Sequence, residues 1–322
     1  MIVMSENISL SVVIPVFNVE MYLERCLKSL TDAEGISDAE IILINDGSSD
    51  GSVKIAEKYC DLFANIRLIN TKNQGPSSAR NLGLKEAKGN YVFFCDSDDE
   101  VVPERFSEVI KMIPDSDADM ILWDAELTDK DGNLFTGKEQ NDYIHSAIVQ
   151  TSDLITGKQL FETELSYKRT FPATVWMGVY SRDYLIKNDL FFETGVMHED
   201  ELWVPQVVLS AQKIRCIPVT VYRYRIREGS LTNPAFEDRS LSAASMVKIY
   251  PELFRALESI LKDDPFLEKV EAVFAQRYLY MIYKYRIWRY GYGKDIDKKM
   301  LWRTSRRFKD KLKVLGLYVV AG

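Results

Sequence analysis

The sequence has little histidine, few cysteines and no long apolar run. With only His145 and His198 present, histidine-centred triads and histidine-rich metal sites are poorly supported. The four cysteines are far apart and form no CxxC pair, so we expect the reduced, mostly buried thiols of a cytosolic protein. Neither a leader pattern nor a run of about 18 apolar residues is found, so we expect a chain that does not cross a membrane.

Basic residues are outnumbered by acidic ones, except near the end of the chain. The 322 residues hold 41 Lys or Arg against 48 Asp or Glu, a formal charge of −7, which argues against a nucleic-acid-binding surface over the whole chain. Residues 277–322, however, hold 13 basic and 3 acidic residues. Hydrophobic residues make up 46% of the chain, enough for a full core.

Short β-branched runs alternate with amphipathic stretches in the first hundred residues. We expect strands at 9–17, 39–44, 66–70 and 91–95, and helices at 19–30, 53–63 and 77–87. This alternation predicts an α/β fold with a doubly wound, mostly parallel, Rossmann-like sheet. Ligands of such sheets bind beyond the carboxyl ends of the strands.

The second half of the chain changes character. We expect a strand at 120–123, a polar excursion at 129–140, helices at 181–190 and 199–211, and a strand at 219–225. Beyond about Pro234 the sequence looks helical to its end. We therefore predict a first domain over residues 1–232 and a helical, basic and aromatic-rich region over 233–322.

Acidic residues follow two of the predicted strands. Asp96, Asp98 and Asp99 crowd one short loop and would repel each other unless a divalent cation or a donor offset their charge; the alternative is an acidic turn that caps the next helix. Asp46, in Asn-Asp-Gly-Ser, could accept from the imide nitrogen of a uracil, or form a plain Asx turn.

A third acidic cluster, His198-Glu199-Asp200, begins a predicted helix. One of its carboxylates could be a general base for a hydroxyl, or both could cap the helix. His198 is more often a hydrogen-bonded neighbour than a catalyst, and Trp203 in the same helix could stack on a sugar or belong to the core.

Five motifs together carry a resemblance to a known family. In chain order they are SVVIPVFN (11–18), NDGSSDGS (45–52), NQGPSSARNLGL (73–84), GNYVFFCDSDD (89–99) and HEDELW (198–203). In order and spacing they resemble family 2 glycosyltransferases of the GT-A fold, in particular bacterial enzymes that build capsular polysaccharide, exopolysaccharide or O-antigen. The resemblance covers roughly residues 10–232.

The resemblance implies a role for each matching residue. The nucleotide of a sugar donor, expected to be UDP, would contact residues at the first two strand ends and in the ARN segment, namely Pro15, Phe17, Asp46, Arg80 and Asn81. Asp98 would hold Mg²⁺ or Mn²⁺, and Asp96 would contact the ribose or sugar. Asp200 would be the catalytic base of an inverting hexosyl or N-acetylhexosaminyl transfer to a saccharide or lipid-linked acceptor.

Two positions depart from the family pattern, and the role of one arginine has two interpretations. Asn45 stands where the family often has Asp, and Gly178 where many relatives have Lys. Arg227, in the segment YRYRIREGS, could clamp the diphosphate or belong to a solvated arginine row.

The basic C-terminal region interleaves Tyr and Trp with Lys and Arg. We expect these aromatics to pack in a core and the basic outer face to touch the inner leaflet of the cytoplasmic membrane, without nucleic acid as a partner. Two other functions stay open: a sugar-nucleotide nucleotidyltransferase, whose Gly-rich basic loop is missing after the first strand, and a catalytically silent nucleotide-sugar-binding subunit of a polysaccharide assembly complex.

Overall fold

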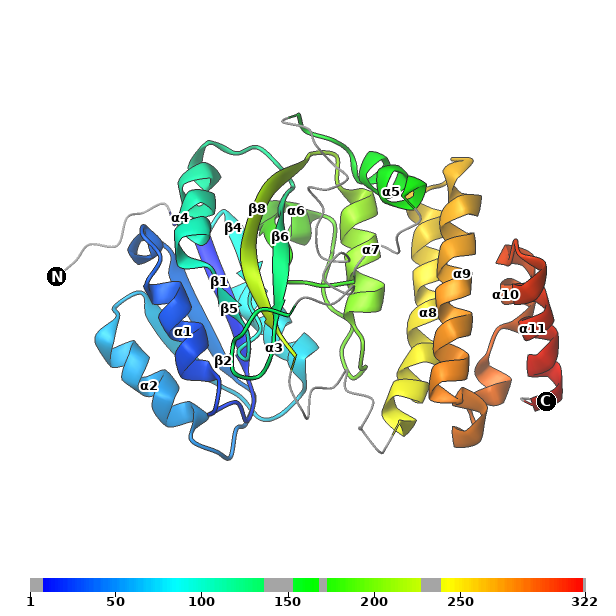
Figure 1. Ribbon diagram of the computed structural model, residues 1–322, viewed down its shortest axis with the longest axis horizontal. Helices are drawn as coiled ribbons and strands as arrows, with labels where there is room; N and C mark the ends of the chain where they lie inside the picture. Colours follow the sequence, from blue (N-terminus) through cyan, green and yellow to red (C-terminus); the bar gives the residue numbers. More distant parts are fainter. Residues whose placement is uncertain (1–7, 136–152, 168–172, 227–238, 321–322) are drawn as a thin grey trace. The chain divides into compact units, whose positions relative to one another are not determined.

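The computed structural model of the chain describes residues 8–135, 153–167, 173–226 and 239–320 (Figure 1). The chain divides into two compact units. Unit 1 consists of Met1–Thr194 and Ala211–Ser230, and unit 2 of Gly195–Ser210 and Leu231–Gly322. The boundary proposed at 232 lies outside the described residues. The segment Gly195–Ser210, expected in the first domain, groups with the C-terminal helices instead.

Unit 1 is built on a sheet whose first half is parallel. Its strands are β1 (Leu10–Val16), β2 (Glu40–Asn45), β3 (Ile66–Asn70) and β4 (Tyr91–Phe94). Their spatial order is β3-β2-β1-β4, with all three neighbouring pairs parallel. The β-branched runs therefore form the buried strands that the sequence predicts, and the strand order reverses between β1 and β4.

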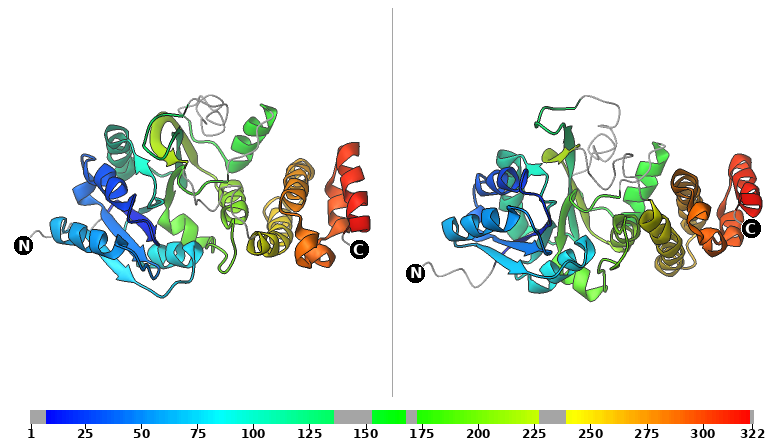
Figure 2. Two further views of the ribbon diagram at one scale, coloured as in Figure 1. Left: turned by 60° about the horizontal axis from the view of Figure 1, so that its bottom comes forward. Right: turned by 90° about the horizontal axis from the view of Figure 1, so that it is seen from below.

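Helices cover both faces of this half-sheet. The connections are α1 (Leu23–Thr31), α2 (Ser52–Leu62) and α3 (Pro76–Glu86). Right-handed crossovers place α1 and α2 on one face and α3 on the other, as the two views of Figure 2 show. Close packing of α3 depends on Gly83, where an added Cβ would lie 2.1 Å from the side chain of Val13.

The second half of the sheet is mixed. It adds β5 (Glu100–Val101), β6 (Met120–Thr128), β7 (Gly178–Ser181) and β8 (Ile214–Arg225) in the order β4-β7-β6-β8-β5, with β6 and β8 parallel and the other three pairs antiparallel. Its helices are α4 (Pro103–Met112), α5 (Gly157–Ser166) and α6 (Arg182–Lys187). Around Phe93 a buried aromatic cluster joins both halves, through Phe106, Trp123 and Tyr222.

Unit 2 is helical throughout its described part. It comprises α7 (Asp200–Ser210), α8 (Ser240–Ile260), α9 (Phe266–Tyr285), α10 (Lys298–Thr304) and α11 (Phe308–Val320). Helices α8 and α9 lie side by side, with α7 against α8, and α10 and α11 against α9. Short 3₁₀ helices in the described part of the chain lie at Ile287–Tyr290 and Tyr292–Asp295 in this unit, and at Ile36–Asp38 and Ile113–Asp115 in unit 1. Among the described helices, none is both long and apolar enough to cross a bilayer.

Candidate functional site

The carboxyl ends of β1, β2 and β4 bring three predicted polar segments to one edge of unit 1. Strand β1 lies between the other two, so residues 17–18, 45–48 and 96–99 follow three adjacent parallel strands. This is the point at which the strand order reverses, where ligands of open α/β sheets bind.

Two loops at this edge are tied together through Asn18. Asn18 adopts a left-handed backbone, with φ 50°, and its Oδ1 accepts from the amide of Ser49 at 2.8 Å. Its own amide donates to the Ser48 hydroxyl at 3.2 Å. Beside it, the ring of Phe17 is 46% exposed. The fixed loop thus presents an accessible aromatic face, which a planar base needs for stacking.

Pro15 lies elsewhere than expected. It stands inside β1, opposite Ile44 of β2, and not in the turn that the resemblance implies. Strand β4 pairs with β1 only up to Val13, so Pro15 has no ladder partner on that side. Proline is tolerated there because its missing N–H removes no hydrogen bond.

The carboxylate of Asp46 is buried and bound to the chain itself. It accepts from the backbone amides of Gln74 and Gly75, both at 2.8 Å, and lies 3.4 Å from the Thr71 hydroxyl. Asp46 therefore holds the loop that leads into α3. Because each carboxylate oxygen has two lone pairs, these bonds leave acceptor capacity for a ligand.

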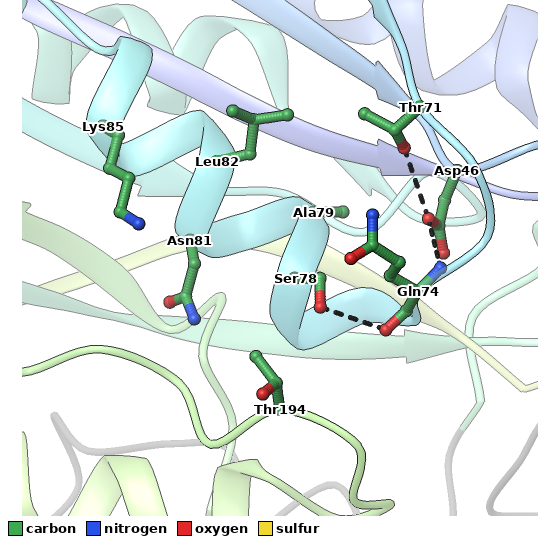
Figure 3. Close-up of a pocket in the computed structure, with 9 residues that line it drawn as sticks. All are labelled: Asp46, Thr71, Gln74, Ser78, Ala79, Asn81, Leu82, Lys85 and Thr194. Carbon is green, nitrogen blue, oxygen red and sulfur yellow. Dashed lines mark hydrogen bonds between the residues drawn. The ribbon is translucent and has the colours of Figure 1, made fainter.

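A pocket opens beside Asp46 along α3 (Figure 3). Its volume is about 280 Å³. Most of its lining residues are of polar type, and Ala79 and Leu82 are the apolar members. The lining consists of Asp46, Thr71, Gln74, Ser78, Ala79, Asn81, Leu82, Lys85 and Thr194. The pocket thus offers carboxylate and amide side chains to a polar ligand that binds at the end of β2.

Arg80 and Asn81 lie one after the other on α3 but have different partners. The guanidinium of Arg80 is buried, pairs with Asp96 at 2.8 Å and lies over the ring of Phe192. Asn81 exchanges two 2.8 Å hydrogen bonds with the backbone of Phe192. Asn81 lines the pocket, but both ends of its side-chain amide bind the backbone of Phe192. Arg80 instead holds Asp96, the first carboxylate of the acidic loop.

The three carboxylates after β4 differ sharply in environment. Asp99 is 1% exposed and accepts from the Tyr222 hydroxyl and the Arg225 amide, both at 2.8 Å. Burial, together with the nearby carboxylates of Asp98 and Asp96, raises the pKa of Asp99 well above its usual value. Asp96 and Asp98 are only partly buried. The acidic turn thus has one internal anchor and two carboxylates nearer to solvent.

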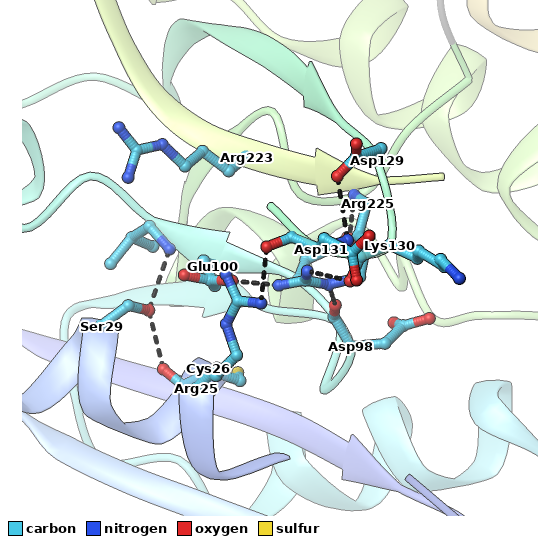
Figure 4. A network of polar contacts seen from close by, with 12 residues as sticks. Arg25, Cys26, Ser29, Asp98, Glu100, Asp129, Lys130, Asp131, Arg223 and Arg225 are labelled. Carbon is cyan, nitrogen blue, oxygen red and sulfur yellow. Dashed lines mark hydrogen bonds and ion pairs between the residues drawn. The ribbon is translucent and has the colours of Figure 1, made fainter. Parts of the chain in front are cut away.

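Arg225, at the end of β8, anchors this loop through several contacts (Figure 4). Its Nε donates to the backbone carbonyl of Asp98 at 2.9 Å and its Nη1 to that of Lys130 at 3.0 Å, while Nη2 pairs with Glu100. Glu100 also pairs with Arg25 of α1 at 2.9 Å. Arg225 is 2% exposed and is therefore buried, although it stands at a strand end. The motifs of the sequence give no sign of this role.

The acidic loop has the donor chemistry for a hard divalent cation. In Figure 4 the carboxylate of Asp98 points away from the guanidinium of Arg225, which binds only the backbone of that residue. Mg²⁺ in phosphate-transferring sites takes one or two carboxylates and obtains its other ligands from substrate and water. No group of three or more acidic, histidine or cysteine side chains suited to a metal occurs in the described parts of the chain. Among the described residues, Asp98 therefore has the chemistry of a ligand to a metal that is shared with a substrate.

Arg227, the proposed diphosphate clamp, lies outside the described residues. Gly178, which stands where many relatives have Lys, begins β7. An added Cβ at Gly178 would be 2.5 Å from the backbone oxygen of Ile121, in the adjacent strand β6. Glycine is thus required here by close approach of β7 to β6, and no side chain can occupy the position without moving a strand.

Asp200 belongs to unit 2, at the first turn of α7. Its Oδ1 accepts from the amide of the next residue, Glu201, at 2.9 Å, and the residue is partly exposed. Glu201 is buried and is bound by Arg277 at 2.5 Å and by the Tyr250 hydroxyl at 3.1 Å. This ion pair, absent from the sequence analysis, fixes the start of α7 to α8 and α9.

The neighbours of Asp200 are structural. Trp203 is 1% exposed, which confirms a core role. His198 has φ 61°, contacts the Ser242 hydroxyl at 3.1 Å and packs beside Tyr285. Of the three carboxylates in the HEDE sequence, Asp200 is therefore the partly exposed one, since Glu199 and Glu201 are buried.

The fold and this edge define an α/β protein with an acidic ligand site at the switch point of a mainly parallel sheet. Residues 11–184 match the family described as glycosyl transferase family 2. Because the match covers more than half of the chain, the chain belongs to this family, as the five motifs predict.

Individual relatives agree with this assignment. The chain is 33% identical to the uncharacterized glycosyltransferase YibD of Escherichia coli over 71% of its length and 64% of the relative. It is 30% identical to the uncharacterized glycosyltransferase EpsJ of Bacillus subtilis, over 69% of the chain and 62% of the relative. The chain thus spans less than two thirds of these relatives.

A solved structure shares the fold over nearly the whole chain. The crystal structure of S. aureus TarS 1-349 in complex with UDP-GlcNAc superposes with a TM-score of 0.63 at 19% identity, covering 97% of this chain and 91% of the other. At this identity the likeness establishes the GT-A-like α/β architecture with its C-terminal helices, and confirms the predicted fold class.

Proposed function

We propose that this protein transfers a sugar from a nucleotide donor, UDP-linked, to a hydroxyl of a saccharide or lipid-linked acceptor in the synthesis of a cell-surface glycan. The observation that carries the proposal is the set of groups at the carboxyl edge of β1, β2 and β4 in a family 2 chain. An exposed Phe17, a buried Asp46 beside a polar pocket and a loop with Asp98 offer contacts for base, nucleoside and diphosphate.

Two names among the similar proteins support the donor and the pathway. TarS was crystallised with UDP-GlcNAc, and a relative from Bacillus subtilis, 28% identical, is named minor teichoic acid biosynthesis protein GgaB. Both names concern glycans or their donors. The same nucleotide chemistry at the site of this chain is part of our proposal.

The proposed reaction is a single inverting displacement. The carboxylate of Asp200 takes the proton of the acceptor hydroxyl while the oxygen of that hydroxyl bonds to the anomeric carbon of the donor sugar. The bond from that carbon to the diphosphate oxygen breaks, and the nucleoside diphosphate leaves with the electron pair. Asp200 is suited to this role because it is partly exposed, in contrast to buried Glu199 and Glu201.

In this proposal the acidic loop assists departure of the diphosphate. Asp98 would hold Mg²⁺ or Mn²⁺, which when bound offsets the charge that develops on the leaving phosphate. Arg80 orients Asp96 toward the ribose or sugar of the donor through their ion pair. Phe17 stacks on the base, and Asp46 accepts from its imide. Arg227 is proposed as a clamp on the diphosphate, on the strength of the resemblance alone.

The alternatives predict different products. A nucleotidyltransferase would join a nucleoside triphosphate and a sugar phosphate, and a silent binding subunit would bind a donor without turnover. The absence of a Gly-rich basic loop after β1 and the presence of Asp46, Asp98 and Asp200 favour the transferase.

The experiment is a panel of nucleotide sugars with the full chain and Mn²⁺, read by thermal shift for binding and by release of UDP for turnover. Asp200→Asn should keep donor binding and lower turnover by at least about a hundredfold, because the general base is lost. Asp98→Asn should weaken donor binding only when the metal is present.

Glu199→Gln is the matched control, because it changes the adjacent carboxylate of the same motif without removing the proposed base. Near-normal turnover in Asp200→Asn would remove the base assignment. Synthesis of a nucleotide sugar from a triphosphate and a sugar phosphate would replace the transferase by the nucleotidyltransferase.

A further inference from the structure

Helix α11 of unit 2 has two opposite faces. Asp310, Val314 and Leu317 are buried against the rest of the unit. On the other side a stripe at helical spacing is exposed, with 77% for Phe308, 51% for Leu312, 49% for Leu315 and 85% for Val319. A four-residue apolar stripe on one helix face is more than a scattered exposed leucine and indicates a contact surface.

Lysines border this stripe on both sides. Lys311 lies on one flank and Lys309 on the other, according to the 100° turn per residue of an α-helix, whereas Lys313 lies farther round, toward the buried face. Among the described residues, no carboxylate lies within ion-pair distance of any of the three lysines, although Arg303, Arg306 and Arg307 nearby are all paired. The charge that borders the apolar stripe is thus uncompensated and positive.

The segment that carries this surface is strongly basic. Residues 298–320 contain eight Lys or Arg and one acidic residue, Asp310, which is buried and bound to Arg307. Trp302 of α10 is 41% exposed, with the ammonium of Lys311 5.1 Å from its ring centroid. Apolar side chains, an aromatic ring and flanking lysines are the composition of a helix that lies in a membrane interface.

We propose that the outer face of α11, defined by Phe308, Leu312, Leu315 and Val319, docks on an anionic lipid surface. The apolar stripe enters the boundary of the acyl chains, and the flanking lysines extend to the phosphate groups. The aromatic residues of the region divide accordingly: Tyr278 and Tyr285 pack in the core of unit 2, and Trp302 remains accessible. This inference does not depend on the proposed transfer reaction.

Self-association is the less suitable occupant. A symmetric dimer on this face would bring the lysines that border the stripe of one copy against those of the other. Like charges at close range oppose such pairing, whereas an anionic lipid surface is complementary to them.

Flotation of the full chain with vesicles tests the proposal. Vesicles of phosphatidylcholine with phosphatidylglycerol should carry the protein upward, and vesicles of phosphatidylcholine alone should do so much less. Binding should weaken as salt rises, because screening reduces the lysine contribution. Leu312→Glu should lower partition at least about tenfold, since it replaces an inserted apolar side chain by a charged one.

Leu62→Glu is the matched control. Leu62 is also an exposed leucine on a helix, with 64% against 51% for Leu312; it lies at the end of α2 in unit 1, and its replacement should leave partition unchanged. Thermal midpoints and circular dichroism would verify that both variants are folded. Lys309→Gln with Lys311→Gln should reduce binding to anionic vesicles and leave the weak binding to neutral vesicles unchanged.

Three results would overturn the proposal. Flotation of Leu312→Glu to the wild-type extent would remove α11 as the contact. Equal binding to neutral and anionic vesicles would remove the lysine contribution. A wild-type dimer in light scattering that Leu312→Glu dissociates, with no flotation of either protein, would assign the face to a second copy of the chain.

Discussion

Arg225 shows how a single buried side chain determines the shape of the acidic loop. Its planar guanidinium reaches three acceptors at once: the carbonyls of Asp98 and Lys130 and the carboxylate of Glu100. It also lies over the ring of Tyr22, 5.6 Å from the centroid. An ammonium has neither the fork geometry nor the reach for these contacts, so Lys is no substitute here.

We therefore expect Arg225→Lys to lower the free energy of unfolding by about 1–3 kcal/mol, because buried acceptors lose their donors. Arg223→Lys is the control two residues earlier on the same strand. Among the described residues, Arg223 forms an ion pair with Glu126, and its side chain is 38% exposed, so its replacement should cost less than about 1 kcal/mol. Chemical denaturation followed by tryptophan fluorescence measures both, and equal losses would contradict the argument.

The buried carboxylate of Asp46 illustrates why a residue's partners are harder to foresee than its place. The sequence correctly places Asp46 directly after a strand, β2, and the structure shows that its side chain is buried. That it holds the amides of Gln74 and Gly75 depends on a loop 28 residues later. No local pattern contains that contact, so only the structure assigns Asp46 this second, structural task.

At the scale of elements, the start of α7 combines a strained residue with a buried titratable group. Burial lowers the pKa of His198, and the carboxylates of Glu201 and Glu199 only partly offset this. The imidazole is therefore neutral in the folded protein at a pH at which the unfolded chain already binds a proton. Protonation favours the unfolded state, so this group destabilises the fold as pH falls below about 6.5.

Between pH 7.5 and 5.5 we expect His198 to account for a loss of up to about 1.4 kcal/mol in the free energy of unfolding. His198→Asn should show a smaller loss over the same interval, because Asn does not titrate and tolerates the positive φ of 61°. Urea denaturation of both proteins at the two pH values measures the difference. The same pH dependence in wild type and variant would mean that His198 is protonated equally in both states.

The elements themselves were predictable to different degrees. β3 has the bounds that its β-branched run predicts, and α1, α2 and α3 begin within a few residues of the expected positions. By contrast, β7 was not foreseen, because four residues around Gly178 give too short a pattern. Its pairing with β4 and β6 is set by tertiary contacts that a local reading does not contain.

At the scale of the whole molecule, the basic C-terminal segment and the acidic loop after β4 belong to different units. The sequence alone locates the basic excess after residue 277, and the structure places that segment in unit 2. The nucleotide-contacting candidates lie in unit 1, apart from Arg227, which is outside the described residues. The proposed base, Asp200, lies in unit 2. A ligand of the strand-end site and a lipid surface should therefore act on separate parts of the chain.

Hydrogen exchange of the full chain can detect this separation. UDP with Mn²⁺ should slow exchange of the amides in residues 71–75 and 96–100, because a ligand at the carboxyl edge of the sheet covers these loops. Anionic vesicles should instead slow exchange in α11, through the face that contains Leu312. The control is UDP without metal, which should protect residues 71–75 more than 96–100. Protection of α11 by UDP, or of residues 71–75 by vesicles alone, would mean that the two surfaces do not act independently.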